Sequence, residues 1–387
     1  MAEEYIDDYR IGVVGGGFAG LMFAMALARL GLDADLYEEH ERVGYPPHCT
    51  GLVSRRVVDL IGDVAWSNVV NKYRGLRVGL DDKWVYIEPS GGVYRLDRVK
   101  LEHDMLEYFE SIGGKPIVGV KVERVEPNGV VYASGRMTRY DLVILADGYH
   151  GRLHKMLGLG YRGSVVYGVN LVYRDALADD AIIVDFDPNL TDRLFAWILK
   201  VDDGVLMGTG VRDPLLLRRR IRLLEAKYSA ATLYSVYGGP ILTGPPASRL
   251  YTGRVVVVGD AAGLNKPLTG GGLYPNALAA RLASDMVRRG YSPLESVRSG
   301  VESVVARLRR QYRIARLLLG NPDVVGLLAE ATARSGLAES LRGEIDYDEH
   351  ELVFRKALKR PVRAVKALYY MLKRPLTTLR LVLGLVI

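Results

Sequence analysis

The feature that most constrains this chain is an uncharged stretch of 18 residues, Ile11 to Ala28, with three consecutive glycines inside it. Its length would suit a membrane-spanning helix or a signal peptide. Gly15–Gly17 interrupt it where a spanning helix needs good helix formers, and no small-residue cleavage site follows. We therefore predict a strand at 9–14, a tight turn and a buried helix at 19–30, in a chain without a spanning helix.

The glycines belong to a nucleotide-binding pattern. Gly15-Gly16-Gly17-Phe18-Ala19-Gly20 fits G-x-G-x-x-G, in which Gly15 makes the tight turn, Gly17 lets the backbone approach a pyrophosphate and Gly20 lets helix and strand pack closely. The helix N-terminus offers N–H donors to the phosphates. A second predicted strand, 34–37, leads into Glu38, whose carboxylate can accept both ribose hydroxyls. The alternative is a glycine turn in an ordinary core.

A second motif makes FAD the expected nucleotide. The apolar run 255–258 ends in Gly259-Asp260, and Gly270-Gly271-Gly272 precede a predicted helix at 273–288. A carboxylate at a strand end can hold the ribityl hydroxyls of a flavin. The helix N-terminus can face the N1–C2 carbonyl edge of the ring, where reduced flavin is negative. The alternative is a Gly-Asp turn followed by a glycine-rich helix cap.

These motifs resemble those of the geranylgeranyl reductases, within the larger group of flavoproteins shaped like p-hydroxybenzoate hydroxylase. The resemblance covers about residues 9–290 and includes the loop 47–51 and the helix start Asp97-Arg98. It implies an α/β fold with an FAD-binding Rossmann-like parallel-sheet domain, an antiparallel β-sheet substrate domain and a C-terminal helical region. We expect the FAD-binding domain at 1–60, 95–160 and 245–290, the substrate domain at 61–94 and 161–244, and the helical region at 291–387.

The resemblance also implies which residues contact FAD. Asp147 matches an Asp-Gly motif of the wider group, although a strand-end turn explains it equally well. Within the glycine motif, the expected contacts are Gly15, Gly17, Ala19 and Gly20. Outside it, they are Glu38, Cys49, Thr50, Gly51, Arg98, the backbone near Val122, Asp260, Gly272 and Leu273.

Three residues are candidates for catalytic roles. Cys49 is the sole cysteine, which excludes an internal disulfide and a cysteine-based metal site, and its loop resembles one that lies beside the flavin ring in the family. Trp197 lies in Phe195-Ala196-Trp197-Ile198-Leu199, which resembles the family's Tyr-x-Trp-x-Phe-Pro segment. Alternate strand residues would form one apolar wall. Tyr274, Cys49 and bound water are candidate acids. Plain packing is the alternative for Cys49 and Trp197, and we expect no metal site.

The expected function is an FAD-dependent reductase that saturates carbon–carbon double bonds of geranylgeranyl chains during the synthesis of archaeal-type membrane lipids. The alternative is an FAD-dependent monooxygenase of an apolar small molecule, and a third class is a non-enzymatic flavoprotein or lipid carrier. No second strand–glycine–helix unit exists for a nicotinamide cofactor, so the electron donor stays open between ferredoxin, NAD(P)H and a reduced quinone. A single glutamine beside 52 basic residues is typical of a thermophile.

The charge of the chain is concentrated at its C-terminus. Residues 351–387 hold nine basic residues and one acid, a formal charge of +8, whereas the whole chain carries +7. The body is therefore close to neutral, which disfavours nucleic acid as a partner. Apolar residues recur at helical spacing between the basic ones, so we expect a cytoplasmic protein whose tail contacts the inner face of the membrane. The alternative is a helix packed on the body with a solvated charged face.

Overall fold

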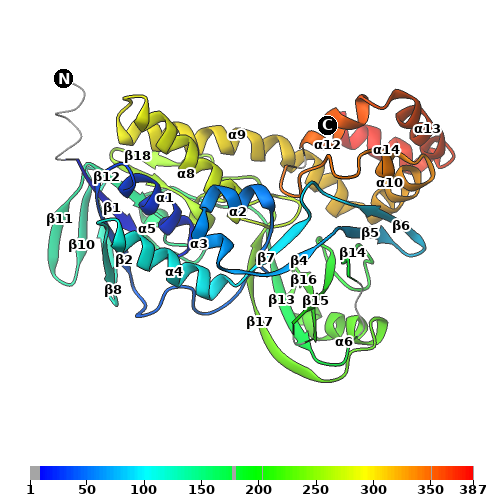
Figure 1. Ribbon diagram of the computed structural model, residues 1–387, viewed down its shortest axis with the longest axis horizontal. Coiled ribbons are helices and arrows are strands. Elements are labelled where there is room, and N and C mark those ends of the chain that lie inside the picture. The colour runs from blue at the N-terminus through cyan, green and yellow to red at the C-terminus, as the bar shows by residue number, and fades with distance from the viewer. Residues whose placement is uncertain (1–8, 177–179, 203, 350, 387) are drawn as a thin grey trace.

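A computed structural model describes residues 9–176, 180–202, 204–349 and 351–386 (Figure 1). Its central sheet has six strands in the order β18-β19-β12-β1-β2-β8. All neighbours pair in parallel except β18, which runs antiparallel to β19. The strands are β1 (Arg10–Val14), β2 (Asp33–Glu38), β8 (Lys115–Val118), β12 (Leu142–Leu145), β18 (Tyr251–Thr252) and β19 (Val255–Val257).

Helix α1 (Phe18–Ala28) begins directly after the glycine turn, as the sequence predicts. Nine of its eleven residues are buried, because α1 lies against both α4 (Arg98–Ser111) and α8 (Leu273–Arg288). The uncharged stretch is therefore a strand, a turn and a core helix. Within the described residues, no helix is both long and apolar enough to cross a bilayer.

A seven-stranded sheet stands beside this layer, in the order β17-β13-β16-β15-β14-β5-β6. Its strands pair antiparallel except β14 and β5, which are parallel. Phe195, Trp197 and Leu199 point to one buried face and Ala196 and Ile198 to the other, as alternation predicts. The strands are β5 (Leu76–Leu80), β6 (Lys83–Ile87), β13 (Val165–Tyr173), β14 (Ile182–Asp185), β15 (Ala196–Val201), β16 (Gly204–Val211) and β17 (Leu233–Leu242).

Smaller elements complete the two layers. One three-stranded sheet contains β3 (Leu52–Ser54), β7 (Val93–Leu96) and β4 (Val69–Tyr73). The other contains β9 (Val122–Val125), β10 (Val130–Ala133) and β11 (Arg136–Arg139), and β9 and β10 form the hairpin expected around 127–129. The short helices are α2 (Arg55–Ile61), α3 (Asp63–Trp66), α5 (Leu153–Met156), the 3-10 turn Pro214–Leu216, α6 (Leu217–Lys227) and α7 (Gly259–Ala262).

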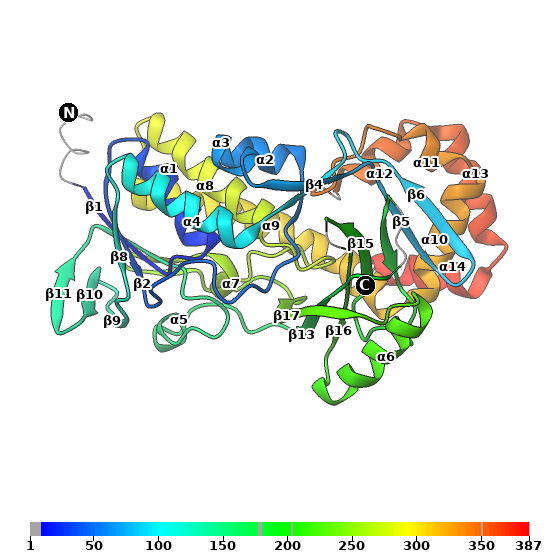
Figure 2. The same ribbon diagram turned by 60° about the horizontal axis from the view of Figure 1, so that its bottom comes forward.

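The C-terminal region is helical, and its last five helices lie at the opposite end of the molecule from β9–β11 (Figure 2). Pro361 and Pro375 each begin a new helix, as their missing N–H groups favour. The helices are α9 (Pro293–Gly320), α10 (Pro322–Arg334), α11 (Leu337–Ser340), α12 (Glu351–Leu358), α13 (Pro361–Leu372) and α14 (Pro375–Val386). The expected fold class is thereby confirmed, whereas the three-region division of the chain stays a prediction.

Three segments differ from the expected secondary structure. Helix α3 lies at 63–66, where the sequence pattern predicted short strands, and that prediction is wrong. Helix α2 and the edge strand β17 form where the pattern predicted no element. Gly238, Gly239 and Pro240 lie inside β17, and such residues normally interrupt a strand. An edge strand tolerates them because one side of its backbone needs no partner.

Candidate active site

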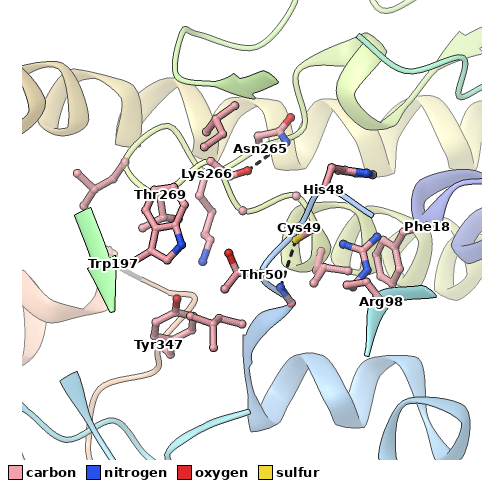
Figure 3. A pocket seen from close by; sticks show the side chains of 18 of the residues that line it. Phe18, His48, Cys49, Thr50, Arg98, Trp197, Asn265, Lys266, Thr269 and Tyr347 are labelled. Carbon is pink, nitrogen blue, oxygen red and sulfur yellow. Dashed lines mark hydrogen bonds between the residues drawn. The ribbon is translucent and has the colours of Figure 1, made fainter. Parts of the chain in front are cut away.

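A cavity of about 550 Å³ lies where the glycine turns of the parallel sheet meet the seven-stranded sheet (Figure 3). One part of its wall is the backbone of Gly17, Gly20 and Gly270–Gly272. The other part is apolar side chains from the seven-stranded sheet. We call this space the main cavity. Its volume falls in the range typical of pockets for whole organic ligands.

The glycine turn has the geometry that a dinucleotide requires. Gly15 has φ +106° and donates its N–H to Tyr37 O (2.8 Å). A Cβ on Gly20 would lie 2.0 Å from Gly15 O, so the helix could not pack here with a larger residue. At Gly17, by contrast, a Cβ would meet nothing within 4 Å. The backbone at Gly17 therefore faces open space in which a phosphate can approach.

Glu38 lies behind this turn, at the end of β2. Its Oε2 accepts the Gly16 N–H (2.7 Å), and its Oε1 accepts the His40 N–H (2.9 Å) and contacts His40 Nδ1 (2.6 Å). The carboxylate is therefore fixed beside the glycine turn, and its expected contact with a ribose stays a prediction.

Most of the cofactor contacts expected from the sequence lie together. The main cavity is lined by Gly17, Ala19, Gly20, Cys49, Thr50, Gly51, Arg98, Asp260, Gly272 and Leu273. Gly15, Glu38, Val122 and Asp147 are not part of this lining. The Asp147 carboxylate accepts hydrogen bonds from Leu153 N (2.9 Å) and contacts His154 Nδ1 (2.8 Å), so it is occupied by the turn, while its neighbours Ala146 and Gly148 reach the cavity.

Cys49 lies beside a buried cation. Gly51 donates its N–H to Cys49 Sγ (3.4 Å), and the Arg98 side chain interacts with the same sulfur and forms an ion pair with Glu102. Burial disfavours the charge of Arg98, but Glu102 and Cys49 outweigh burial and raise its pKa. A buried positive charge therefore lies at the cavity wall next to Cys49.

The wall also contains polar atoms whose hydrogen-bonding capacity is unused. Among the residues that the structure describes, Arg98 Nε, Asn265 Oδ1 and Thr269 Oγ1 are buried without a hydrogen-bond partner. Buried polar atoms are normally satisfied, so unsatisfied ones in a cavity wall indicate a polar ligand. Together with the open backbone at Gly17 and the N-terminus of α8 at Gly272, these atoms fit FAD.

Asn170, on β13, is a site residue that the sequence analysis missed. Its buried Oδ1 accepts from Trp197 Nε1 (2.9 Å) and from Thr50 Oγ1 (3.3 Å), and its Nδ2 donates to His48 O (3.4 Å). One amide thus holds the cysteine loop against the tryptophan wall. The available signal was a polar residue at the centre of an otherwise apolar predicted strand.

Tyr274 lies away from the other catalytic candidates. It does not line the main cavity, and its hydroxyl donates to Glu349 Oε1 (2.6 Å). Burial and the Glu349 carboxylate raise the pKa of Tyr274, with Arg56 and Arg307 opposing the rise. Cys49 and Trp197 do line the main cavity, so this arrangement favours Cys49 over Tyr274 as a proton donor there.

A buried ion pair, also missed, completes the wall. Lys266 Nζ pairs with Asp348 Oδ1, and both side chains are at most 3% exposed. Asp348 Oδ2 also accepts the Ser54 N–H (2.7 Å), and Lys266 Nζ lies 4.9 Å from the centre of the Tyr347 ring. The Lys266 side chain reaches into the main cavity toward Tyr347 (Figure 3). The pair joins the flavin-side loop to residues 345–349 of the C-terminal region.

Comparison with known proteins agrees with this geometry. Residues 13–52 match the family described as "NAD(P)-binding Rossmann-like domain". Digeranylgeranylglycerophospholipid reductase 1 of Methanopyrus kandleri is 24% identical over 344 residues, which cover 79% of this chain and 87% of that protein. Geranylgeranyl diphosphate reductase of Synechocystis is 27% identical over 323 residues, with 72% and 75% covered. Over most of its length the chain is therefore similar in sequence to geranylgeranyl reductases.

A solved structure shows the same fold. The geranylgeranyl bacteriochlorophyll reductase-like protein of Thermoplasma acidophilum superposes with a TM-score of 0.77 at 18% identity, covering 90% of this chain and 95% of that one. The chain is an oxidoreductase and its cofactor is FAD. The expected resemblance to geranylgeranyl reductases, the enzyme class and the cofactor are thereby confirmed, and the individual residue roles stay predictions.

The cofactor contacts can be tested directly. Glu38→Ala and Asp260→Ala should each raise the Kd for FAD at least about tenfold, equal to about 1.4 kcal/mol, because each removes a charged acceptor. Flavin content per chain after gel filtration and titration of the apoprotein with FAD measure the effect. Glu39→Ala is the matched control, since Glu39 pairs with the exposed Lys121. Full flavin content in both variants would defeat the assignment.

Proposed function

We propose that the chain reduces carbon–carbon double bonds of geranylgeranyl or related polyisoprenoid chains in lipid biosynthesis. The observation that carries the proposal is a large apolar wall facing the cofactor loops across one cavity. Hydrocarbon side chains of that wall include Leu76, Val78, Ile182, Val184, Phe186, Leu194, Phe195, Trp197, Ile241 and Leu268. The printed names of the relatives, reductases of geranylgeranyl lipids and of geranylgeranyl diphosphate, support the same substrate class.

In this reaction the residues of the chain position the substrate, exclude water from the cavity and donate a proton. Bound FAD, when reduced, supplies a hydride. The apolar wall excludes water and aligns the alkene, and Trp197 is held in it by Asn170 and by an edge-to-face contact with Phe195 at 6.2 Å. Cys49 Sγ, which interacts with the Arg98 side chain, donates the proton that the second alkene carbon receives.

The test is a lipid-hydrogenation assay with dithionite as reductant, which removes the need to know whether ferredoxin, NAD(P)H or a quinone is the donor. Wild-type protein should yield saturated isoprenoid chains by mass spectrometry. Cys49→Ala should keep its FAD and lose activity by about a hundredfold or more, the usual effect of losing a general acid. His48→Ala, on the same loop, is the control and should stay within a few-fold of wild type.

Other outcomes would point elsewhere. Unchanged activity in Cys49→Ala would make the cysteine a packing residue. Oxygen consumption matched by hydroxylated product would establish the alternative, a monooxygenase of an apolar molecule. No turnover of the flavin with any reductant would favour a non-enzymatic flavoprotein.

We also infer that the C-terminal helices dock the enzyme on the anionic inner face of the cell membrane, where a lipid substrate resides. Helix α13 packs on α10 with Ala367 buried, and Arg374 and Arg380 pair with Glu330 and Asp323. The opposite side is apolar and exposed. This apolar face consists of Val362, Val365, Leu368, Tyr369, Leu372, Leu376, Leu379, Val382 and Leu383, each at least 48% exposed.

The charge around the apolar face argues for a membrane rather than a second protein copy. Residues 351–387 hold nine basic residues against one acid. Two such faces in one dimer would bring two clusters of like charge together. An anionic lipid surface attracts them instead, with about 1 kcal/mol for each basic residue near the surface at low salt.

A further inference from the structure

A second cavity of about 270 Å³ lies beside the main one, among α8, α9 and α12. Three arginines line it: Arg307 and Arg310 from α9, and Arg355 from α12. Among the side chains that the structure describes, Glu349 is the one acidic residue in its lining. We call this space the arginine cavity. It is smaller than the roughly 300–1,000 Å³ of a pocket for a whole organic ligand, so its size suits a headgroup.

The negative charge of Glu349 is already compensated. Its Oε1 accepts from the Tyr274 hydroxyl (2.6 Å) and pairs with Arg56 Nη1 (2.5 Å). Within the part of the chain that the structure describes, neither Arg307 nor Arg355 has an acidic partner within 4 Å. The arginine cavity is therefore positive and attracts an anion.

The two cavities meet at one residue. Lys266 lines both of them, and its charge is balanced by Asp348. On one side of Lys266 the walls are hydrocarbon, and on the other side they carry guanidinium groups. An amphiphile with an apolar chain and an anionic end matches these two surfaces. Its chain would contact the hydrocarbon side chains, and its anionic end would contact the guanidinium groups.

We propose that the arginine cavity binds the phosphate or diphosphate group of an isoprenoid whose hydrocarbon chain enters the main cavity past Lys266. This assignment rests on the proposed function and adds the place where the charged end of the substrate binds, among Arg307, Arg310 and Arg355. Arginine is suited to the task because its planar guanidinium binds phosphate oxygens in pairs and keeps its charge.

The test is isothermal titration of the flavin-loaded full chain with three probes: geranylgeranyl diphosphate, geranylgeraniol and inorganic pyrophosphate. Arg307→Gln and Arg355→Gln should each weaken binding of geranylgeranyl diphosphate about tenfold, and the double variant about a hundredfold. Binding of geranylgeraniol should change less than about twofold. Arg313→Gln, an exposed arginine of α9 outside the cavity, is the matched control and should leave both affinities unchanged.

Three results would overturn the assignment. The first is that the double variant binds geranylgeranyl diphosphate as tightly as wild type. The second is that it loses affinity for the diphosphate and for geranylgeraniol equally, which would mean that the arginines support the fold. The third is that it loses affinity for pyrophosphate alone, which would indicate a site for free phosphate. Arg355 is exposed, so its single variant tests the site even if Arg307→Gln impairs folding.

Failure of the site is distinguishable from failure of the function. If the double variant no longer binds the diphosphate but the reduced wild-type protein saturates no isoprenoid, the anion site is supported and the proposed reaction is wrong. If wild type saturates geranylgeraniol and the double variant handles the diphosphate normally, the reaction stands and the anion site falls.

Discussion

Asp348→Ala should lower the free energy of unfolding by about 3–5 kcal/mol, because it leaves the ammonium group of Lys266 buried without a counter-charge. Both side chains are at most 3% exposed, so water cannot replace the lost partner. The Ser54 N–H also loses its acceptor. Urea unfolding of the flavin-loaded protein, followed by circular dichroism, measures the change.

The double variant Lys266→Met/Asp348→Leu is the decisive comparison for this pair. Removing both charges leaves apolar groups of similar size, so most of the loss should be recovered. Glu39→Ala breaks an exposed ion pair with Lys121 and should cost no more than about 1 kcal/mol. If the double variant is as unstable as Asp348→Ala, the cost comes from packing and the electrostatic explanation is wrong.

The second large effect concerns the apolar face of α13 and α14. Val362 and Leu376 are 81% and 77% exposed, so replacing both by glutamate should leave the fold intact. It should weaken binding to anionic liposomes by about a hundredfold, because two apolar anchors worth roughly 1.5 kcal/mol each become charged groups. Cosedimentation at low and high salt measures the effect, and salt should also weaken wild-type binding.

A control lies at the far end of the molecule. Met137, on β11, is 71% exposed, and Met137→Glu should leave liposome binding unchanged (Figure 2). Equal binding by wild type and the Val362/Leu376 variant would refute the docking surface. A dimer in lipid-free solution that the same two substitutions dissociate would show that a second copy covers the face. Deleting the tail is a poorer test, since α13 packs on α10 and its removal would expose the core.

The sequence predicts best the parts in which backbone geometry limits the choice of residue. Glycines at positions that tolerate no side chain, or directly before a helix, predict three features. These are the glycine turn, α1 and the start of α8 at Leu273. Strand β13 runs over Val165–Tyr173, a segment whose β-branched and aromatic residues favour a strand. Such local rules fail for β17, whose pairing with β13 overrides the glycines and proline within it.

The site is less predictable because its partners are distant in sequence. Lys266 and Asp348 are 82 residues apart, and Asn170 and Thr50 are 120 apart. Nothing local identifies which of 45 acidic residues will neutralise a given lysine. The cofactor side could be inferred because its glycines and acids lie in short motifs, whereas the charged and amide groups of the substrate side are brought together by the tertiary fold.

The segment 345–349 gives the cavity a modular wall. Ile345 and Tyr347 line the main cavity, yet they come from the C-terminal region and not from the cofactor loops or the strands of the large sheet. Their backbone is attached to the turn between β6 and β7 by Ser90 N, which donates to Ile345 O (2.7 Å). Exchange of side chains in this short segment would alter how long a hydrocarbon chain fits while the redox half of the enzyme stays as it is. Substitutions in this segment could therefore change the length of the preferred substrate without a change of fold.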